Sequence, residues 1–323
     1  MIVIKEDELI NSTAYVREPV DKEVNEILSS EKSRIILSGD YRGTGRTTVL
    51  HALETRGVGS KTQTICIAPD RVGSGRCIDE EVQEYYTELI FSLYILGYIS
   101  AYYPIAFEKH FKKDYESINN YLKLYHDYMN KCLFDNSVKL DLVYKAKELS
   151  SVIIDRLRNV FEIEKLNIAI DGFDSIRGSE EFYQRAYANY FDLFDKVILI
   201  SDDQNLNKDR LTKKGYEIKE LNYGMDKDVL REIVRRRIKY QNKNSSNKME
   251  LNYYTQPKLI ESLAKLGPNI DFAFSVIEDI KGQRKWYEGI DKSFEELYEK
   301  AVKTQTDEYE EARKRGKGKT LYL

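Results

Sequence analysis

A glycine-rich segment near the N-terminus contains residue types that bind phosphate in proteins. It reads SGDYRGTGRTT over residues 38–48 and directly follows the apolar run at 34–37. Gly43 and Gly45 allow the backbone to bend until successive N–H groups point at one anion, and a helix that begins near Gly45 adds a partial positive charge. The other loop residues expected to line this site are Arg42, Thr44 and Thr48. The segment predicts a phosphate-binding loop between a strand and a helix.

The start of that helix and the end of a later apolar run carry further polar side chains. Thr47 stands where a hydroxyl ligates Mg²⁺, and Arg46 stands where a cation meets the terminal phosphates. The apolar run at 166–170 ends in Asp171, and Asp174 follows three residues later. Because Asp171 is followed by glycine, and Asp-Gly is a turn dipeptide, this run taken alone is also compatible with a strand that ends in a solvated turn.

Short apolar runs separated by helical patterns supply the elements that would position these residues. The runs typical of buried strands cover residues 34–38, 64–68, 167–171 and 196–201. The alternating run at 216–221 predicts a fifth strand at a sheet edge, and helices are expected at 45–55 and from about Glu180 to Phe194. Buried runs that alternate with helices favour a parallel sheet covered on both faces.

The composition excludes several classes of protein. The 323 residues correspond to one large or two modest domains, and a hydrophobic content of 41% argues against disorder, collagen or a coiled rod. Lys and Arg number 51 against 54 Asp and Glu, so any affinity for nucleic acid needs a local basic patch. Three Cys and three His are scattered without zinc-site spacing, and the acidic N-terminus lacks the pattern of a secretory signal. We therefore expect a cytoplasmic protein.

One uncharged segment requires a membrane test. Residues 89–107 contain no charged side chain, a length close to the roughly 20 residues that span a bilayer. Tyr, Ser, Gly and Pro interrupt the segment, however, and acidic residues crowd its upstream flank, where basic residues usually flank a membrane span. The pattern favours a buried or interface helix over a membrane segment.

The segment at 38–48 resembles the Walker A loop of P-loop NTPases, whose pattern is G-x-x-x-x-G-K-[ST]. It departs from that pattern at two positions. Asp40 stands at the first glycine, or Gly39 fills that place in a loop one residue longer, and Arg46 replaces the lysine. Arginine keeps the charge, but its planar fork differs from the point donor of lysine, so the change is not conservative.

The run that ends at Asp171 resembles the Walker B strand of the same family, which implies that Asp171 holds Mg²⁺ through water. Many members carry a Glu directly after this Asp, whereas this chain has Gly172. Asp174 matches the D-G-x-D variant of the signalling (STAND) branch, which implies that it polarises a water molecule. The following strand carries a polar sensor residue near the terminal phosphate in this family, and Ser201 or Asp202 falls there.

The N-terminal segment Tyr15–Glu18 resembles the lead-in of ORC/Cdc6-like and STAND ATPases, which implies that Val16 and Arg17 line an adenine pocket. The helical region after residue 221 resembles the lid of those ATPases. Its usual sensor arginine is missing, because Ile270 or Asp271 stands at that position.

The resemblance covers roughly residues 14–285 and implies a fold and its divisions. The fold class expected is α/β, a three-layer P-loop NTPase with a parallel five-stranded sheet in the order 5-1-4-3-2, an enlarged helical insertion and an all-helical lid. The divisions expected are a core at 1–222 with its insertion at about 79–160, a lid at 223–290, and a helical and basic tail at 291–323.

The function implied is that of an AAA+ or STAND-like switch that binds ATP and Mg²⁺ and acts on a protein or protein–DNA partner. Asp40, Arg46, Gly172 and the missing sensor arginine predict slow or absent hydrolysis, at most a weak ATPase. The alternative is a catalytically inactive P-loop adaptor or structural protein that uses insertion tyrosines as an interaction surface, although such tyrosines also pack in cores. These tyrosines are Tyr85, Tyr86, Tyr94, Tyr98, Tyr102 and Tyr103.

Two basic features bear on partners. One predicted helix carries the arginines Arg231, Arg235, Arg236 and Arg237. Such a row is typical of a solvated face, and the alternatives are a contact to a DNA backbone or to a second subunit. The basic tail at 312–319 is a second candidate for DNA contact. We therefore expect a protein partner, with self-association and DNA binding as further interpretations.

Overall fold

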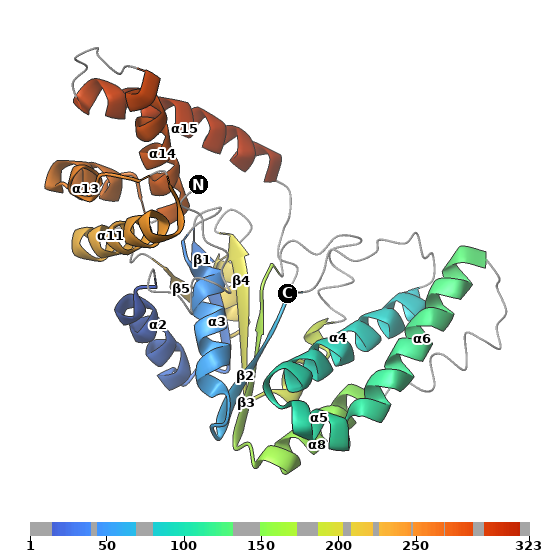
Figure 1. The fold of residues 1–323 in the computed structure, drawn as a ribbon. Helices are drawn as coiled ribbons and strands as arrows, with labels where there is room; N and C mark the ends of the chain where they lie inside the picture. The colour runs from blue at the N-terminus through green and yellow to red at the C-terminus, as the bar shows by residue number, and fades with distance from the viewer. Residues whose placement is uncertain are drawn as a thin grey trace.

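Five parallel strands form the centre of the computed structural model (Figure 1). The strands are β1 (Arg34–Gly39), β2 (Thr62–Ile67), β3 (Lys165–Ile170), β4 (Lys196–Asp202) and β5 (Glu217–Glu220). Their order across the sheet is β2-β3-β4-β1-β5, which confirms the α/β class, the five strands and the strand order expected from the sequence. The structure describes residues 15–39, 44–68, 80–131, 149–172, 187–202, 208–221, 226–246, 248–267, 269–286 and 294–316.

Apolar side chains cover both faces of the sheet. The helices of this part are α2 (Arg17–Ser29), α3 (Arg46–Gly57), α4 (Glu80–Tyr102), α5 (Pro104–His110), α6 (Lys112–Lys131), α8 (Leu149–Phe161) and α10 (Lys208–Lys213). Along β1, Ile35 and Leu37 pack in a cluster with α2 and α3, whereas Ile36 belongs to the cluster with α4 and α8. This alternation follows from the period of two in a strand, and near-continuous apolar runs arise because both faces are buried.

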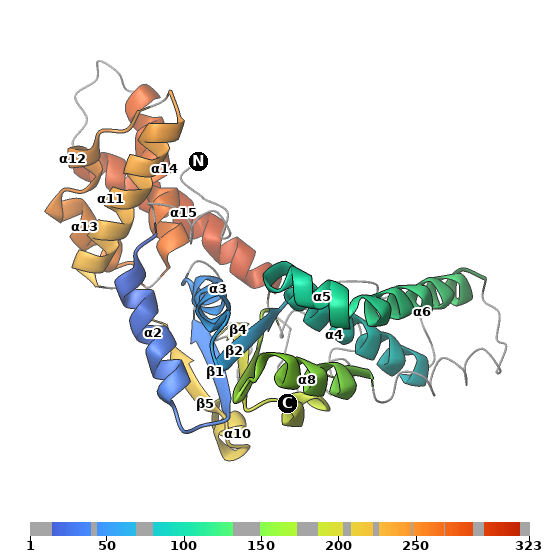
Figure 2. The ribbon, with the colours of Figure 1, turned by 60° about the horizontal axis from the view of Figure 1, so that its bottom comes forward.

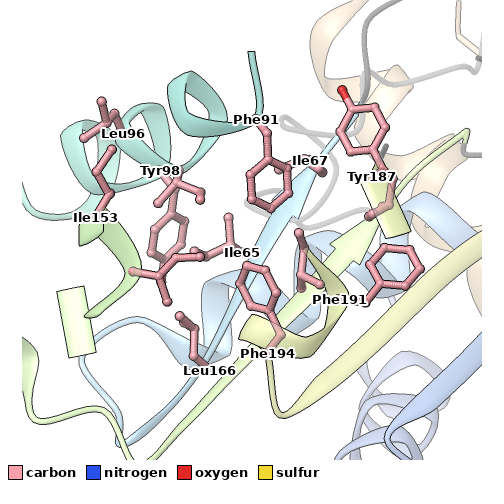
Figure 3. Packing of buried hydrophobic residues seen from close by; sticks show 14 of the residues in the cluster. Ile65, Ile67, Phe91, Leu96, Tyr98, Ile153, Leu166, Tyr187, Phe191 and Phe194 are labelled. Carbon is pink, nitrogen blue, oxygen red and sulfur yellow. The ribbon is translucent and has the colours of Figure 1, made fainter. Parts of the chain in front are cut away.

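The uncharged segment at 89–107 is split between α4 and α5, with Pro104 at the start of α5. Phe91 and Ile99 on α4 are fully buried, and Figure 3 shows Phe91 beside Phe194 and Tyr187. Among the helices that the structure describes, none combines the length and the apolar character needed to cross a bilayer. The prediction of a buried helix is confirmed.

The insertion tyrosines pack toward the core. Tyr86 and Tyr98 are buried, with exposed fractions of 6% and 4%. Tyr94, Tyr102 and Tyr103 are half-buried and pack against the same apolar cluster. The side chain of Tyr85 lies outside the described residues. Core packing, rather than display to a partner, is thus the arrangement observed for the five described tyrosines.

The helix expected from about Glu180 to Phe194 ends before Phe194. Residues 187–188 are α-helical, residues 189–190 form a turn, and Phe191–Leu193 form the 3₁₀ helix η2; residues 180–186 lie outside the described range. Phe191 and Phe194 are both buried, and Phe91 packs against Phe194 with ring centroids 6.1 Å apart. A tight 3₁₀ turn brings residues three apart onto one side, which is how both rings reach this cluster.

The C-terminal helices form a second apolar cluster beyond the carboxyl ends of the strands (Figures 1 and 2). They are α11 (Lys227–Asn244), α12 (Leu251–Tyr254), α13 (Pro257–Ala264), α14 (Ile270–Trp286) and α15 (Phe294–Gly316). The carboxylate of Asp226 caps α11 by accepting hydrogen bonds from the N–H groups of Asp228 and Val229, at 2.9 and 3.1 Å. Fully buried residues such as Val234, Ile260 and Ile277 join three of these helices.

Candidate functional site

The candidate site lies where β1, β3 and β4 end and α3 begins. Because the strands are parallel, their carboxyl ends meet at one edge of the sheet, and the order β3-β4-β1 makes these three strands neighbours. Ser38 and Gly39 on β1 pair in register with Ser201 and Asp202 on β4. The start of α3 therefore adjoins the polar ends of β3 and β4, as ligand sites in open parallel sheets require.

Thr47 and Asp171 lie in direct contact. The Thr47 hydroxyl on the first turn of α3 donates a hydrogen bond of 2.8 Å to a carboxylate oxygen of Asp171. The backbone N–H of Asp171 in turn donates to the carbonyl of Ile67 at 2.8 Å, so pairing with β2 extends to the end of β3. Gly172 then turns the chain with a φ of 64°, a conformation that glycine adopts without strain. The two predicted metal ligands are thus held together.

The glycine-rich loop closes tightly at its two described ends. A Cβ on Gly39 would lie 2.7 Å from the Thr44 hydroxyl, so a side chain does not fit there, and this favours Gly39 over Asp40 as the first loop glycine. Gly45 has a φ of 83° and directly precedes α3. Arg42 and Gly43 lie outside the described residues.

Two buried hydroxyls in this region have no hydrogen-bond partner. Ser38 is fully buried and Thr44 is 2% exposed, and neither hydroxyl oxygen has a hydrogen-bond partner among the residues that the structure describes. A buried polar group without a partner costs about 1–3 kcal/mol, so such groups usually serve a ligand or bound water. Their position at the loop therefore fits a polar ligand.

Arg46 is turned inward toward the ends of the strands. Its guanidinium donates hydrogen bonds to the carbonyl of Ser201 at 2.6 Å and to that of Gly39 at 3.4 Å, and the residue is 9% exposed. It therefore links the start of α3 to the ends of β1 and β4. The terminal-phosphate contact predicted for Arg46 requires the guanidinium to leave or share these carbonyls.

Some of the remaining predicted residues lie at the carboxyl edge of the sheet, and others lie away from it. Ser201 is buried at the end of β4, and Thr48 is half-buried on α3. Val16 packs against the apolar cluster of the C-terminal helices, whereas Arg17 lies on the exposed outer face of α2. Asp174 lies outside the described residues.

Three arginines of helix α11 contact other side chains of the protein. Arg235 and Arg236 both donate to the carboxylate of Glu232, each with its Nε at 2.6 Å. The hydrogen bonds from Arg235, and then those from Arg236, lower the pKa of Glu232 to about 2. The Arg237 guanidinium lies over the Phe274 ring, 4.6 Å from its centroid. DNA contact by this helix stays a prediction, and it would compete with these contacts.

A buried carboxylate that the sequence did not single out links α3 to the insertion. Glu54 accepts hydrogen bonds from the Cys66 N–H at 3.2 Å and the Tyr102 hydroxyl at 3.0 Å. Burial raises the pKa of Glu54, against the opposing effect of these bonds and of His51. The Tyr98 hydroxyl donates to Gln63 at 3.0 Å nearby. A lone Glu in a helical pattern carries no sequence signal for such a role.

Comparison with known proteins does not assign the chain to a family. No protein-family model matches the sequence, and no curated protein is significantly similar to it. Within the described ranges, no group of three or more His, Cys, Asp or Glu side chains is arranged to hold a metal ion. Among the described side chains at this edge, Thr47 and Asp171 are the two that the sequence predicts as metal ligands.

Proposed function

We propose that the chain binds ATP and Mg²⁺ and acts as a nucleotide-dependent switch for a protein or protein–DNA partner. The observation that carries the proposal is the 2.8 Å hydrogen bond from Thr47 to Asp171, because a hydroxyl at a helix start beside a strand-end carboxylate is the metal-holding pair of P-loop NTPases. The strand order and the closed ends of the glycine-rich loop support the same proposal. Both features agree with what the resemblance of the sequence to AAA+ proteins of the ORC/Cdc6-like or STAND type implies.

Different residues would bind the phosphates, the metal ion and the nucleotide base. The N-terminus of α3 and the loop amides attract the phosphates, because the helix dipole and N–H groups there favour anions. Thr47 and Asp171 would hold Mg²⁺, which when bound neutralises charge on the phosphates. The unpartnered hydroxyls of Ser38 and Thr44 would take part in hydrogen bonding near the loop. Val16 would contact the nucleotide base beside the C-terminal helices.

The same residues favour a switch over a fast hydrolase. Arg46 is engaged by the carbonyls of Ser201 and Gly39, so charge stabilisation at a terminal phosphate requires rearrangement. Gly172 has no side chain with which to orient an attacking water molecule. Occupancy of the site, rather than rapid turnover, would then set the angle between core and C-terminal helices and the affinity for a partner.

Thermal unfolding with and without ATP·Mg²⁺ tests this proposal. At a ligand concentration one hundred times the Kd, a protein that binds only when folded gains about 2.7 kcal/mol. We expect such a gain for the wild type and a much smaller one for Thr47→Ala. Thr55→Ala is the control, because Thr55 lies on the same helix and its hydroxyl donates to the helix carbonyls of His51 and Ala52. A wild-type melting curve unchanged by ATP·Mg²⁺ would refute the proposal.

A further inference from the structure

One peptide bond connects two of the apolar clusters of the molecule. Tyr15 is 7% exposed and packs in the cluster formed with α2, α3 and β1. Val16, the next residue, packs against the cluster of the C-terminal helices. Adjacent side chains thus belong to two different cores, and the peptide between them lies at the boundary.

A charged side chain from α11 holds this same peptide. The Arg236 Nη1 donates a hydrogen bond of 2.7 Å to the Tyr15 carbonyl, which belongs to the peptide joining Tyr15 to Val16. The Nε of Arg236 is fixed by Glu232 at 2.6 Å. A planar guanidinium donates from several nitrogens at once, so one side chain can join the helix carboxylate to the boundary peptide.

This contact gives α11 a second attachment to the core. The helix follows β5 along the chain, and its capping residue Asp226 lies five residues beyond Leu221. A helix attached at one end can tilt about that end, whereas a second attachment ten residues into α11 restricts the tilt. The contact from Arg236 to Tyr15 is therefore placed to set how the C-terminal helices meet the core.

We propose that Arg236 is a positioning residue that fixes the angle of the C-terminal helices by holding the Tyr15–Val16 peptide. Its link to ligand binding rests on the proposed function: Val16 would contact the nucleotide base, so Arg236 would couple occupancy of that site to the position of α11. A Lys at this position carries its donors on one nitrogen, whereas Arg236 reaches the Glu232 carboxylate and the Tyr15 carbonyl from two separate nitrogens.

Arg235 provides a closely matched control. It donates to the same carboxylate, with its Nε at 2.6 Å, and its side chain is 42% exposed, compared with 39% for Arg236. Arg236 is the one of the two that also donates a hydrogen bond to the Tyr15 carbonyl, among the residues that the structure describes. Loss of either arginine therefore removes one partner of Glu232, and loss of Arg236 alone also removes the boundary contact.

The test compares Arg236→Ala, Arg236→Lys and Arg235→Ala in the full chain by hydrogen exchange and by titration with ATP·Mg²⁺. Without nucleotide, we expect Arg236→Ala to speed exchange of the amides in residues 15–20 and Arg235→Ala to leave them near wild type. Affinity for ATP·Mg²⁺ should fall about tenfold in Arg236→Ala, the lower end for a partly exposed charged hydrogen bond, and about twofold or less in Arg235→Ala. Arg236→Lys keeps the charge and has its donors on a single nitrogen, so it should recover at most part of each effect.

Two results would overturn the inference. One is equal exchange at residues 15–20 in Arg235→Ala and Arg236→Ala, which would leave Arg236 with no role beyond its bond to Glu232. The other is full rescue by Arg236→Lys, which would assign the effect to charge alone. If the wild type shows no response to ATP·Mg²⁺, the proposed function fails, and exchange without nucleotide still decides whether Arg236 positions the helices.

Discussion

Thr47 and Asp171 lie 124 residues apart in the sequence, yet their side chains share a hydrogen bond. Each residue is held by its own element, Thr47 by the first turn of α3 and Asp171 by the last pairing of β3 with β2. A neutral hydroxyl and a carboxylate placed in this way can both turn toward a cation at small cost, because neither is buried deeply. The chemistry of the site thus depends on two rigid supports rather than on the loop between them.

Arg46 should contribute to the stability of the protein without nucleotide. In Arg46→Ala, the buried carbonyl of Ser201 loses the donor at 2.6 Å, and such a loss costs about 1–3 kcal/mol. We expect denaturant unfolding to show this destabilisation, and Arg46→Lys to recover part of it through a single donor. If Arg46→Ala unfolded at the same denaturant concentration as the wild type, the hydrogen bond from Arg46 to the Ser201 carbonyl would contribute nothing measurable to stability.

At the scale of elements, polar contacts join α3 to the helical insertion at about 79–160. Glu54 bonds to β2 through Cys66 and to α4 through Tyr102. The Tyr103 hydroxyl accepts from the N–H of Gly59, at 2.7 Å, just beyond the end of α3. Because α3 also carries Thr47, these contacts connect the position of the insertion to the helix that begins the candidate site.

The raised pKa of Glu54 predicts a pH dependence of stability. A carboxyl whose folded pKa is raised favours the folded state below its unfolded value, near 4.5, and this contribution is lost as the pH rises through the folded pKa. The free energy of unfolding should therefore decline over that interval in the wild type. Glu54→Gln stays neutral and should lack this component, and equal pH profiles for the two proteins would contradict the assignment.

The fold was predictable where local pattern and burial agree. Four buried strands followed from continuous apolar runs and the edge strand from an alternating run, whereas the order of the strands was expected from the resemblance to P-loop NTPases. The helix expected up to Phe194 ends earlier, because a 3₁₀ turn at Phe191–Leu193 lets Phe191 and Phe194 both join the buried cluster, an arrangement decided by tertiary contacts. The partners of Glu54 and Arg236 were beyond prediction for the same reason, since polar contacts between distant elements leave no periodic signal.

At the scale of the whole molecule, the peptide between Tyr15 and Val16 joins the cluster formed with α2, α3 and β1 to the cluster of the C-terminal helices. A switch of the proposed kind needs two accessible arrangements of these clusters, and this peptide is a place where they would move relative to each other.

Small-angle X-ray scattering should detect this change of arrangement. We expect the radius of gyration to decrease when ATP·Mg²⁺ is added to the wild type, because the ligand would contact both clusters. Asp171→Asn should respond weakly at the same ligand concentration, since it loses the charge that attracts Mg²⁺. Identical scattering profiles in a wild type shown to be saturated would mean that binding is not coupled to the angle.

Calorimetric titration with ATP, in the presence and absence of Mg²⁺, tests the central claim most directly. The account predicts saturable binding to the wild type that strengthens with Mg²⁺. It predicts loss of that Mg²⁺ dependence in Asp171→Asn and Thr47→Ala, with Thr55→Ala unchanged. The absence of binding heat at any temperature tried, or the same Mg²⁺ dependence in Asp171→Asn as in the wild type, would contradict a nucleotide site built on Thr47 and Asp171.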